Sequence, residues 1–197
     1  FDRQPGVAYW NLLCLGQALH PLAGELDTVR AALQAYPHTF QDALARRLRA
    51  KLGLSSPHEG DEALVQALLT LLAQDGVDHP IFWRRLAHAV DSGDFSPVGA
   101  LFSNRAAWAA WLLSYSERLA LLDKALAAEL MLKTNPKYVL RNHVAEQTIR
   151  AAAQGDMAPL HTVQRLLARP FDEHPGHDAW TDFPPDWAEH LAISCSS

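Results

Sequence analysis

The sequence has little of what several classes of protein need. Only two of its 197 residues are cysteines, far fewer than a secreted disulfide scaffold contains, so we expect a reducing, cytoplasmic compartment. Its uninterrupted apolar runs are a few residues long, whereas a membrane-spanning helix needs about 20. The formal net charge of -5 is unlike that of a phosphate-binding surface. We therefore expect neither a membrane nor a nucleic acid as a partner.

The motifs that usually mark a catalytic site are also missing. The sequence contains no G-x-S-x-G or S-x-x-K nucleophile motif, no phosphate-binding G-x-x-x-x-G-K-[ST] loop and no G-x-G-x-x-G. No pair of histidines stands four residues apart beside a glutamate, as in a helical zinc site. We therefore assign no catalytic, cofactor-binding or metal-binding residue in this chain. The chain lacks both an initiator methionine and the layout of a signal peptide, and we expect it to begin part-way through a longer protein.

The residues that are abundant favour helices. Leucine and alanine dominate, while isoleucine, valine and threonine are sparse, and no stretch alternates with period two between turn residues. The composition predicts an all-α fold, an irregular array of several helices. We expect a helical region over residues 1–169 and a tail rich in proline and aromatic residues over 170–197, with one short helix near 185–191.

The limits of two helices can be predicted from caps and apolar spacing. The longest is expected to start at a cap on Ser103 or Asn104 and to continue to Leu132, since large apolar residues recur along it at three- and four-residue spacing. A second is expected over residues 137–154, starting after Asn135-Pro136, with Arg141 packing or pairing against neighbouring elements.

Three positions could carry chemistry. The segment from Asp172 to Asp178 (DEHPGHD) has side chains that suit a transition metal, but all lie in one short loop, so a solvated, hydrogen-bonded turn is the favoured interpretation. Cys195 stands close to the end of the sequence, where a thiol can be oxidised or can reach another thiol, or can remain inert. Cys14 lies on an apolar helical face, so we expect it to be buried.

Five strings, taken in order, resemble the C-terminal part of the selenoprotein O family of kinase-related proteins. They span essentially the whole chain, and the match is weakest between residues 31 and 99. The strings are FDRQP at 1–5 followed by WNL at 10–12, TNPKYVLRN at 134–142, RPFDE at 169–173, FPPDWA at 183–188 and SCSS at 194–197.

The resemblance implies a parent protein with a kinase-like fold. The resemblance implies that the parent is a pseudokinase that transfers AMP, rather than phosphate, from ATP. The transfer uses Mg²⁺, and the acceptors are hydroxyl groups of protein substrates. The family's catalytic and metal-binding residues precede the string that begins at Phe1, so none is carried over. Cys195 matches a family selenocysteine or cysteine thought to form a redox link with an upstream cysteine. The partners implied are the N-terminal kinase-like portion of the same protein and the parent's substrates.

The leading hypothesis is therefore the helical C-terminal region of a bacterial protein adenylyltransferase, inactive on its own, with a structural or regulatory role. The bacterial source is suggested by a composition rich in arginine and alanine and poor in lysine. Two alternatives stay open. One is a stand-alone helical module that binds a partner protein, and the other is a metal-dependent enzyme built on the loop from Asp172 to Asp178.

Overall fold

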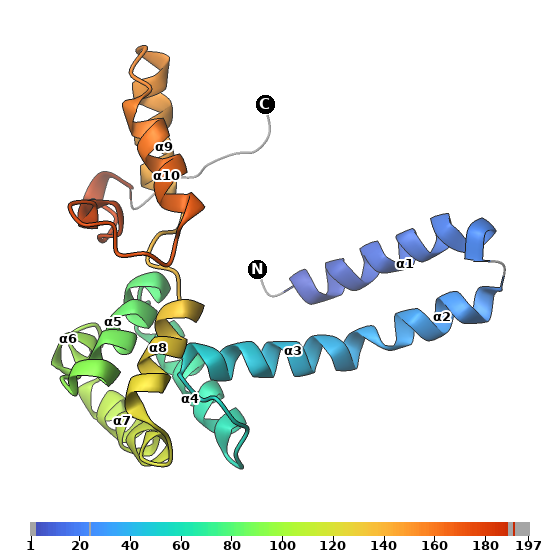
Figure 1. The fold of residues 1–197 in the computed structure, drawn as a ribbon, viewed down its shortest axis with the longest axis horizontal. Helices are drawn as coiled ribbons and strands as arrows, with labels where there is room; N and C mark the ends of the chain where they lie inside the picture. The colour runs from blue at the N-terminus through green and yellow to red at the C-terminus, as the bar shows by residue number, and fades with distance from the viewer. Residues whose placement is uncertain (1–2, 24, 189–190, 192–197) are drawn as a thin grey trace. The chain divides into compact units, whose positions relative to one another are not determined.

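A computed structural model describes residues 3–23, 25–188 and 191. These residues form α-helices and two short 3-10 helices and contain no β-strand (Figure 1), so the prediction of an all-α chain is confirmed. No described helix is long and apolar enough to cross a membrane. The helices are α1 (Gln4–Ala23), α2 (Leu26–Gln34), α3 (Tyr36–Lys51), α4 (Asp61–Gln74), α5 (His79–Ser92), α6 (Ser96–Gly99), α7 (Arg105–Leu119), α8 (Lys124–Thr134), α9 (Asn142–Ala153), α10 (Ala158–Ala168), η1 (Asp178–Trp180) and η2 (Asp186–Ala188).

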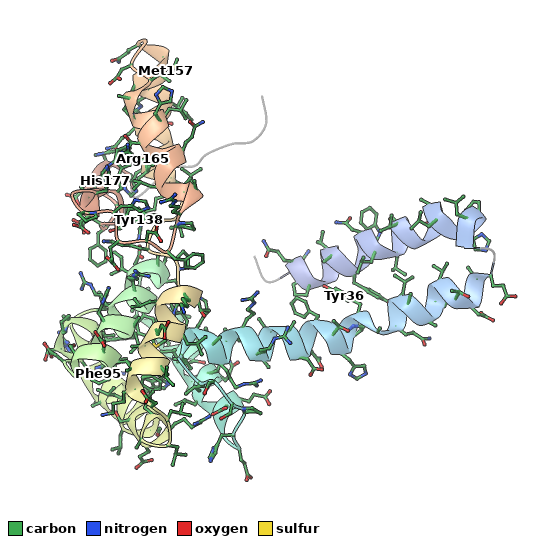
Figure 2. All side chains as sticks on the ribbon, viewed as in Figure 1. Tyr36, Phe95, Tyr138, Met157, Arg165 and His177 are labelled. Atoms are coloured by element: carbon green, nitrogen blue, oxygen red, sulfur yellow. The ribbon has the colours of Figure 1, made fainter. Side chains whose placement is uncertain are left out.

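The chain divides into two compact units, Phe1–Leu48 and Arg49–Ser197. The division expected between residues 169 and 170 stays a prediction. In the first unit α1 packs along α2, and Gly16 makes the approach close, because a Cβ atom there would lie 2.8 Å from Cγ1 of Val29. The hydroxyl of Tyr36 donates a hydrogen bond to the carbonyl of Pro5 over 3.1 Å (Figure 2).

The second unit has an aromatic core. Rings from α5, α7 and the turn between them pack with centroids 4.6–6.3 Å apart, either stacked or edge to face. Tyr115 is fully buried, and its hydroxyl donates to the carbonyl of Leu52 over 2.9 Å. Burial raises the pKa of this hydroxyl, so it stays neutral. The core rings are Phe82, Phe102, Trp108, Trp111 and Tyr115.

Helix α8 packs against α5 and passes close to Gly53. Gly53, which follows α3, has a φ of 73°, and a Cβ atom there would meet the carbonyl oxygen of Ala127 at 2.9 Å. The left-handed backbone favours glycine, and so does the lack of space. This residue thereby allows α8 to reach the core.

The prediction of a single helix up to Leu132 is wrong. The cap on Asn104 is confirmed, since its side chain accepts a hydrogen bond from the backbone N–H of Ala107. The helix ends at Leu119, however, and α8 starts after Asp123, whose carboxylate accepts from the N–H of Leu126 over 3.1 Å. This cap stabilises the start of a second helix and so favours the break.

The helix expected over 137–154 begins later, at Asn142. The backbone N–H groups of Lys137 and Tyr138 both donate to the carbonyl of Pro170, over 2.8 and 3.0 Å. Because these donors are already bound to another segment, residues 137–141 are held outside the helix. The expected pairing of Arg141 is confirmed: its guanidinium makes two hydrogen bonds to Asp78, over 2.7 and 2.8 Å.

Candidate functional site

Two of the five strings that resemble the family lie side by side in the structure. Residues 135–138 bind residues 170–173 through the two backbone hydrogen bonds to Pro170. The hydroxyl of Tyr138 adds a third contact by donating to the carbonyl of Glu173 over 2.9 Å. We call residues 135–138 and 170–173, together with Arg84 of α5, the junction. It is the most densely hydrogen-bonded polar region among the described residues.

Arg84 is the centre of the junction, and only 9% of its side chain is exposed. One terminal nitrogen donates to the carbonyls of Leu132 and Asn135, each over 3.1 Å, and the other to the carbonyl of Phe171 over 3.1 Å and to the carboxylate of Glu173. A planar guanidinium suits this task because its donors point in fixed, divergent directions. A single side chain thus joins α5, the end of α8 and the segment that follows α10.

A second polar contact holds the other side of the junction. The side-chain amide of Asn135, fully buried, donates to the carbonyl of Lys51 over 2.9 Å and accepts from the ammonium of Lys51 over 2.7 Å. The ammonium also lies 4.8 Å from the ring centroid of Trp83. Partial burial lowers the pKa of Lys51. Arg46 and Arg47 are exposed on the same helix, whereas Lys51 contributes to the interior.

Glu173 and Lys137 carry the opposite charges of the junction. Lys137 donates to the carboxylate of Glu173 over 2.8 Å and to that of Asp178 over 2.7 Å. Partial burial alone would raise the pKa of Glu173. The hydrogen bonds and positive charges of Lys137 and Arg84 outweigh burial and lower this pKa to about 2. The carboxylate is therefore ionised over the whole neutral and mildly acidic range.

This shift predicts how stability depends on pH. The pKa of Glu173 falls from 4.5 to about 2 on folding, so its stabilising contribution is present above pH 4.5 and is lost as the pH falls toward 2. We expect the difference in unfolding free energy between wild type and Glu173→Gln to shrink across this window. Urea titrations at several pH values would measure it, with exposed Glu117→Gln as the control. A difference that does not change with pH would contradict the assignment.

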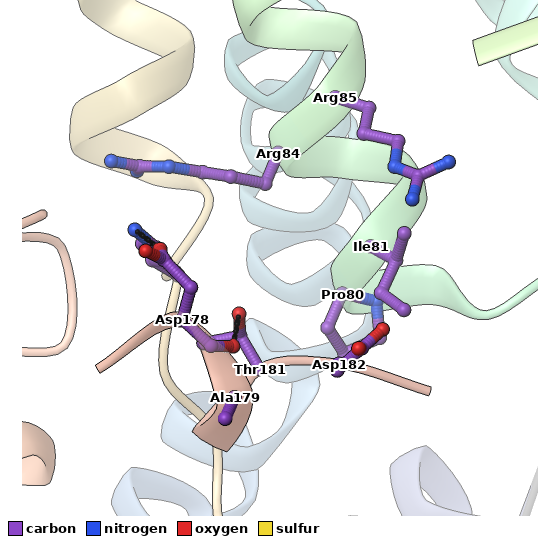
Figure 3. Close-up of a pocket in the computed structure, with 9 residues that line it drawn as sticks. Pro80, Ile81, Arg84, Arg85, Asp178, Ala179, Thr181 and Asp182 are labelled. Carbon is purple, nitrogen blue, oxygen red and sulfur yellow. Dashed lines mark hydrogen bonds and ion pairs between the residues drawn. The ribbon is translucent and has the colours of Figure 1, made fainter. Parts of the chain in front are cut away.

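An open pocket of about 470 Å³ lies beside the junction (Figure 3). Most of its charged side chains are engaged in contacts within the chain. Asp178 is paired with Lys137, and Arg85 donates to the carbonyl of Pro97 over 3.3 Å and lies 5.6 Å from the ring centroid of Phe183. Asp182, the other lining carboxylate, accepts from the N–H of Phe183 over 2.8 Å. With Asp178 held by Lys137, this lining does not supply the several free oxygen ligands that Mg²⁺ needs.

The loop from Asp172 to Asp178 is a hydrogen-bonded turn. His174 bonds to the carbonyl of Arg169 over 3.0 Å, and His177 lies 3.0 Å from the guanidinium of Arg165 (Figure 2). Within residues 3–23, 25–188 and 191, no group of three histidine, cysteine or acidic side chains is placed to hold a metal ion. The alternative of a metal-dependent enzyme therefore finds no ligand set in that part of the chain.

The two cysteines have different outcomes. Cys14 is exposed on α1, so the prediction that it is buried is wrong. Helix α1 carries apolar residues on more faces than α2 covers. Which of these faces is covered depends on tertiary packing, so the sequence pattern could not place Cys14. Cys195, the predicted redox residue, lies outside the described residues, and its role stays a prediction.

Sequence reasoning missed the most connected residue of the junction. Arg84 stands among apolar residues of α5 and belongs to none of the five strings. Three of its four partners are backbone carbonyls, which leave no mark on a sequence. By contrast, Lys137, Tyr138 and Glu173 all belong to strings that the resemblance singled out.

Comparison with known proteins identifies the family of this chain. The family model described as "Protein adenylyltransferase SelO" matches residues 1–168. The chain belongs to this protein adenylyltransferase family. Over its full length it is 54% identical to "Protein nucleotidyltransferase YdiU" of Variovorax paradoxus, 53% to that of Albidiferax ferrireducens and 42% to that of Cupriavidus metallidurans. In each case it spans about 40% of the relative's length.

Proposed function

We propose that this chain is the C-terminal helical part of a kinase-like protein adenylyltransferase, which transfers AMP from ATP to hydroxyl groups of protein substrates. The residues that bind ATP and Mg²⁺ belong to the remainder of the protein. The role of this part is structural or regulatory, and its working surface is the face of α1 that α2 leaves uncovered. We expect the whole protein to act in the bacterial cytoplasm.

The observation that carries the proposal is the composition of α1. This helix has 20 residues and contains no aspartate, glutamate, lysine or arginine. Its exposed fractions reach 62% for Trp10, 54% for Val7 and 85% for Leu22, while Gly16 and Tyr9 face α2 and α3. A helix without charged residues that exposes several large apolar side chains is normally covered by another element. The uncovered face of α1 therefore needs a partner.

The remainder of the same protein is the partner that fits best. The relatives named above are more than twice as long as this chain, so most of a protein of this family lies outside it. An uncharged, aromatic-bearing face is typical of a permanent contact, which resembles the core of a domain, whereas transient interfaces are more polar. The rival function, a stand-alone module that binds another protein, would use the same face.

The experiment compares the whole protein with variants of this face. Trp10→Glu places a charge in the proposed contact, and we expect it to reduce labelling of substrate proteins with AMP at least about tenfold and to expose the contact to proteolysis. Gln34→Glu, which adds the same charge to an exposed position of α2, should leave both unchanged. The chain of 197 residues alone should not bind ATP in calorimetry.

The outcomes separate the two functions. Full AMP transfer by Trp10→Glu, or ATP binding by this chain alone, would contradict the proposed division of labour. Loss of binding to a different protein, with AMP transfer intact, would favour the stand-alone module.

The proposal also includes a redox role for Cys195. Its thiol would form a disulfide with a cysteine upstream of this chain by exchange with another disulfide, which is reduced in turn.

A further inference from the structure

A second pocket, of about 360 Å³, lies between the start of α9 and the segment around η1. All of its lining residues belong to the second unit, so the pocket shares no residue with the face of α1. The residues that matter to its chemistry are His143 and Val144 from α9 and Trp180, Asp182, Phe183 and Pro185 from the segment.

The N-terminus of α9 opens into this region with its backbone donors free. The first helical hydrogen bond runs from the N–H of Ala145 to the carbonyl of Arg141, over 2.9 Å. Arg141 provides no side-chain cap, because its guanidinium is bound to Asp78. The N–H groups of residues 142–144 therefore have no acceptor among the residues that the structure describes. The start of a helix of this length favours a negatively charged group.

His143 gives an independent indication of a ligand. Its exposed fraction is 6%, yet its ring makes no hydrogen bond to any described residue. Its ring nitrogens are not among the fully enclosed atoms without a partner, so they face open space, and the pocket is the space that His143 lines. Burial, followed by the charge of Arg141, lowers the pKa of His143, while Asp78 opposes the shift. The neutral ring offers one donor and one acceptor.

The segment around η1 supplies the complementary chemistry. One carboxylate oxygen of Asp182 accepts from the N–H of Phe183 over 2.8 Å, and no hydrogen bond from a described residue occupies the other oxygen. The rings of Trp180 and Phe183 and the side chain of Pro185 give the pocket apolar walls. A simple anion would meet the charge of Asp182, and a simple amine would meet the positive end of α9. A ligand that carries both charges satisfies both groups.

We propose that this pocket binds a free amino acid with an apolar side chain. Its carboxylate accepts hydrogen bonds from the N-terminus of α9 and from His143, and its ammonium group binds the carboxylate of Asp182. Its side chain lies against Trp180, Phe183 and Pro185. The pocket volume falls within the range of small-molecule sites.

The test uses L-phenylalanine as the probe, with calorimetry on the full chain. We expect saturable binding with a dissociation constant below about 1 mM. Two analogues each lack one charge: 3-phenylpropanoate has no ammonium group and phenethylamine has no carboxylate. Each should bind at least about tenfold more weakly than L-phenylalanine, since one charged contact is worth about 1.4 kcal/mol or more.

Variants locate the site. Asp182→Asn removes the ammonium partner at an exposed position and should weaken binding of L-phenylalanine at least about tenfold, while binding of 3-phenylpropanoate should not weaken, because the same change removes a charge that repels it. Asp186→Asn, in η2 and outside the pocket lining, should bind like wild type. Equal binding of L-phenylalanine by Asp182→Asn and wild type would overturn the proposal. So would the absence of saturable binding up to about 10 mM.

Discussion

Asp61→Ala is expected to lower the free energy of unfolding by about 3–5 kcal/mol, because it leaves a buried charge without its partner. Asp61 and Arg118 are paired over 2.8 Å, with side chains 5% and 7% exposed. The carboxylate of Asp61 also accepts from the N–H of His58 over 2.9 Å, and Arg118 donates to the carbonyl of Ser56 over 2.7 Å. The pair thus fixes the loop before α4 onto α7. Denaturant unfolding followed by circular dichroism would measure the loss.

An exposed pair in the same unit provides the control. Glu129 and Lys133 are 2.5 Å apart on α8, but their side chains are 57% and 71% exposed. Glu129→Ala should cost no more than about 0.5 kcal/mol, because solvent screens such pairs. The double variant Asp61→Ala with Arg118→Met should recover more than half of the loss, since it removes the unpaired cation. A loss below about 1 kcal/mol for Asp61→Ala would show that Arg118 finds another partner.

The sequence predicted much of the helical framework because the local signals are strong. Asp78 followed by Pro80 is a local pattern typical of a capped helix start, and the carboxylate of Asp78 accepts from the N–H of Ile81 over 3.1 Å. Helix α10 likewise begins with Pro159 in its first turn. Caps and first-turn prolines act within four residues, so their effect can be read without the rest of the fold.

The break between α7 and α8 shows where local signals fail. The apolar spacing continues from Trp108 to Leu126 without interruption. Leu126 nevertheless belongs to α8, a separate helix, and is 64% exposed. Periodicity reports which residues could share a face, but it does not report whether the chain turns between them. The break instead depends on the cap of Asp123 and on the packing of α8 against α5, and the second of these is a tertiary contact.

The junction could be predicted only in part, for a different reason. The strings that contain Lys137 and Glu173 stood out, but nothing in the sequence indicated that they meet. Their contact spans 36 residues, and the contacts of Arg84 span 48 to 89. Because three of those contacts end on carbonyl oxygens, residue identity at the acceptor is not constrained. A pattern search therefore finds the side chains of such a site and misses their common centre.

Arg84→Met is the variant that tests this centre most directly. Methionine keeps most of the apolar stem but removes donors to three carbonyls and to Glu173, and we expect a loss of about 2–4 kcal/mol in unfolding free energy. Its neighbour Arg85 is half-buried and makes only a 3.3 Å bond to the carbonyl of Pro97 and a contact with the ring of Phe183, so Arg85→Met should cost less than about 1 kcal/mol. Urea unfolding of both variants gives the comparison.

Hydrogen exchange separates a local effect of Arg84→Met from a general one. The amides of Lys137 and Tyr138 bind the carbonyl of Pro170, which precedes the Arg84 partner Phe171, so their protection should fall first when the guanidinium is lost. The buried part of α7 around Tyr115 should keep its protection at low denaturant, because its contacts do not pass through the junction. Equal loss of protection in α7 and at residues 137–138 would mean that Arg84 stabilises the whole unit. Selective loss would mean that the segment after α10 is attached separately from the core of the unit, mainly through Arg84 and the charged side chains of Glu173 and Lys137.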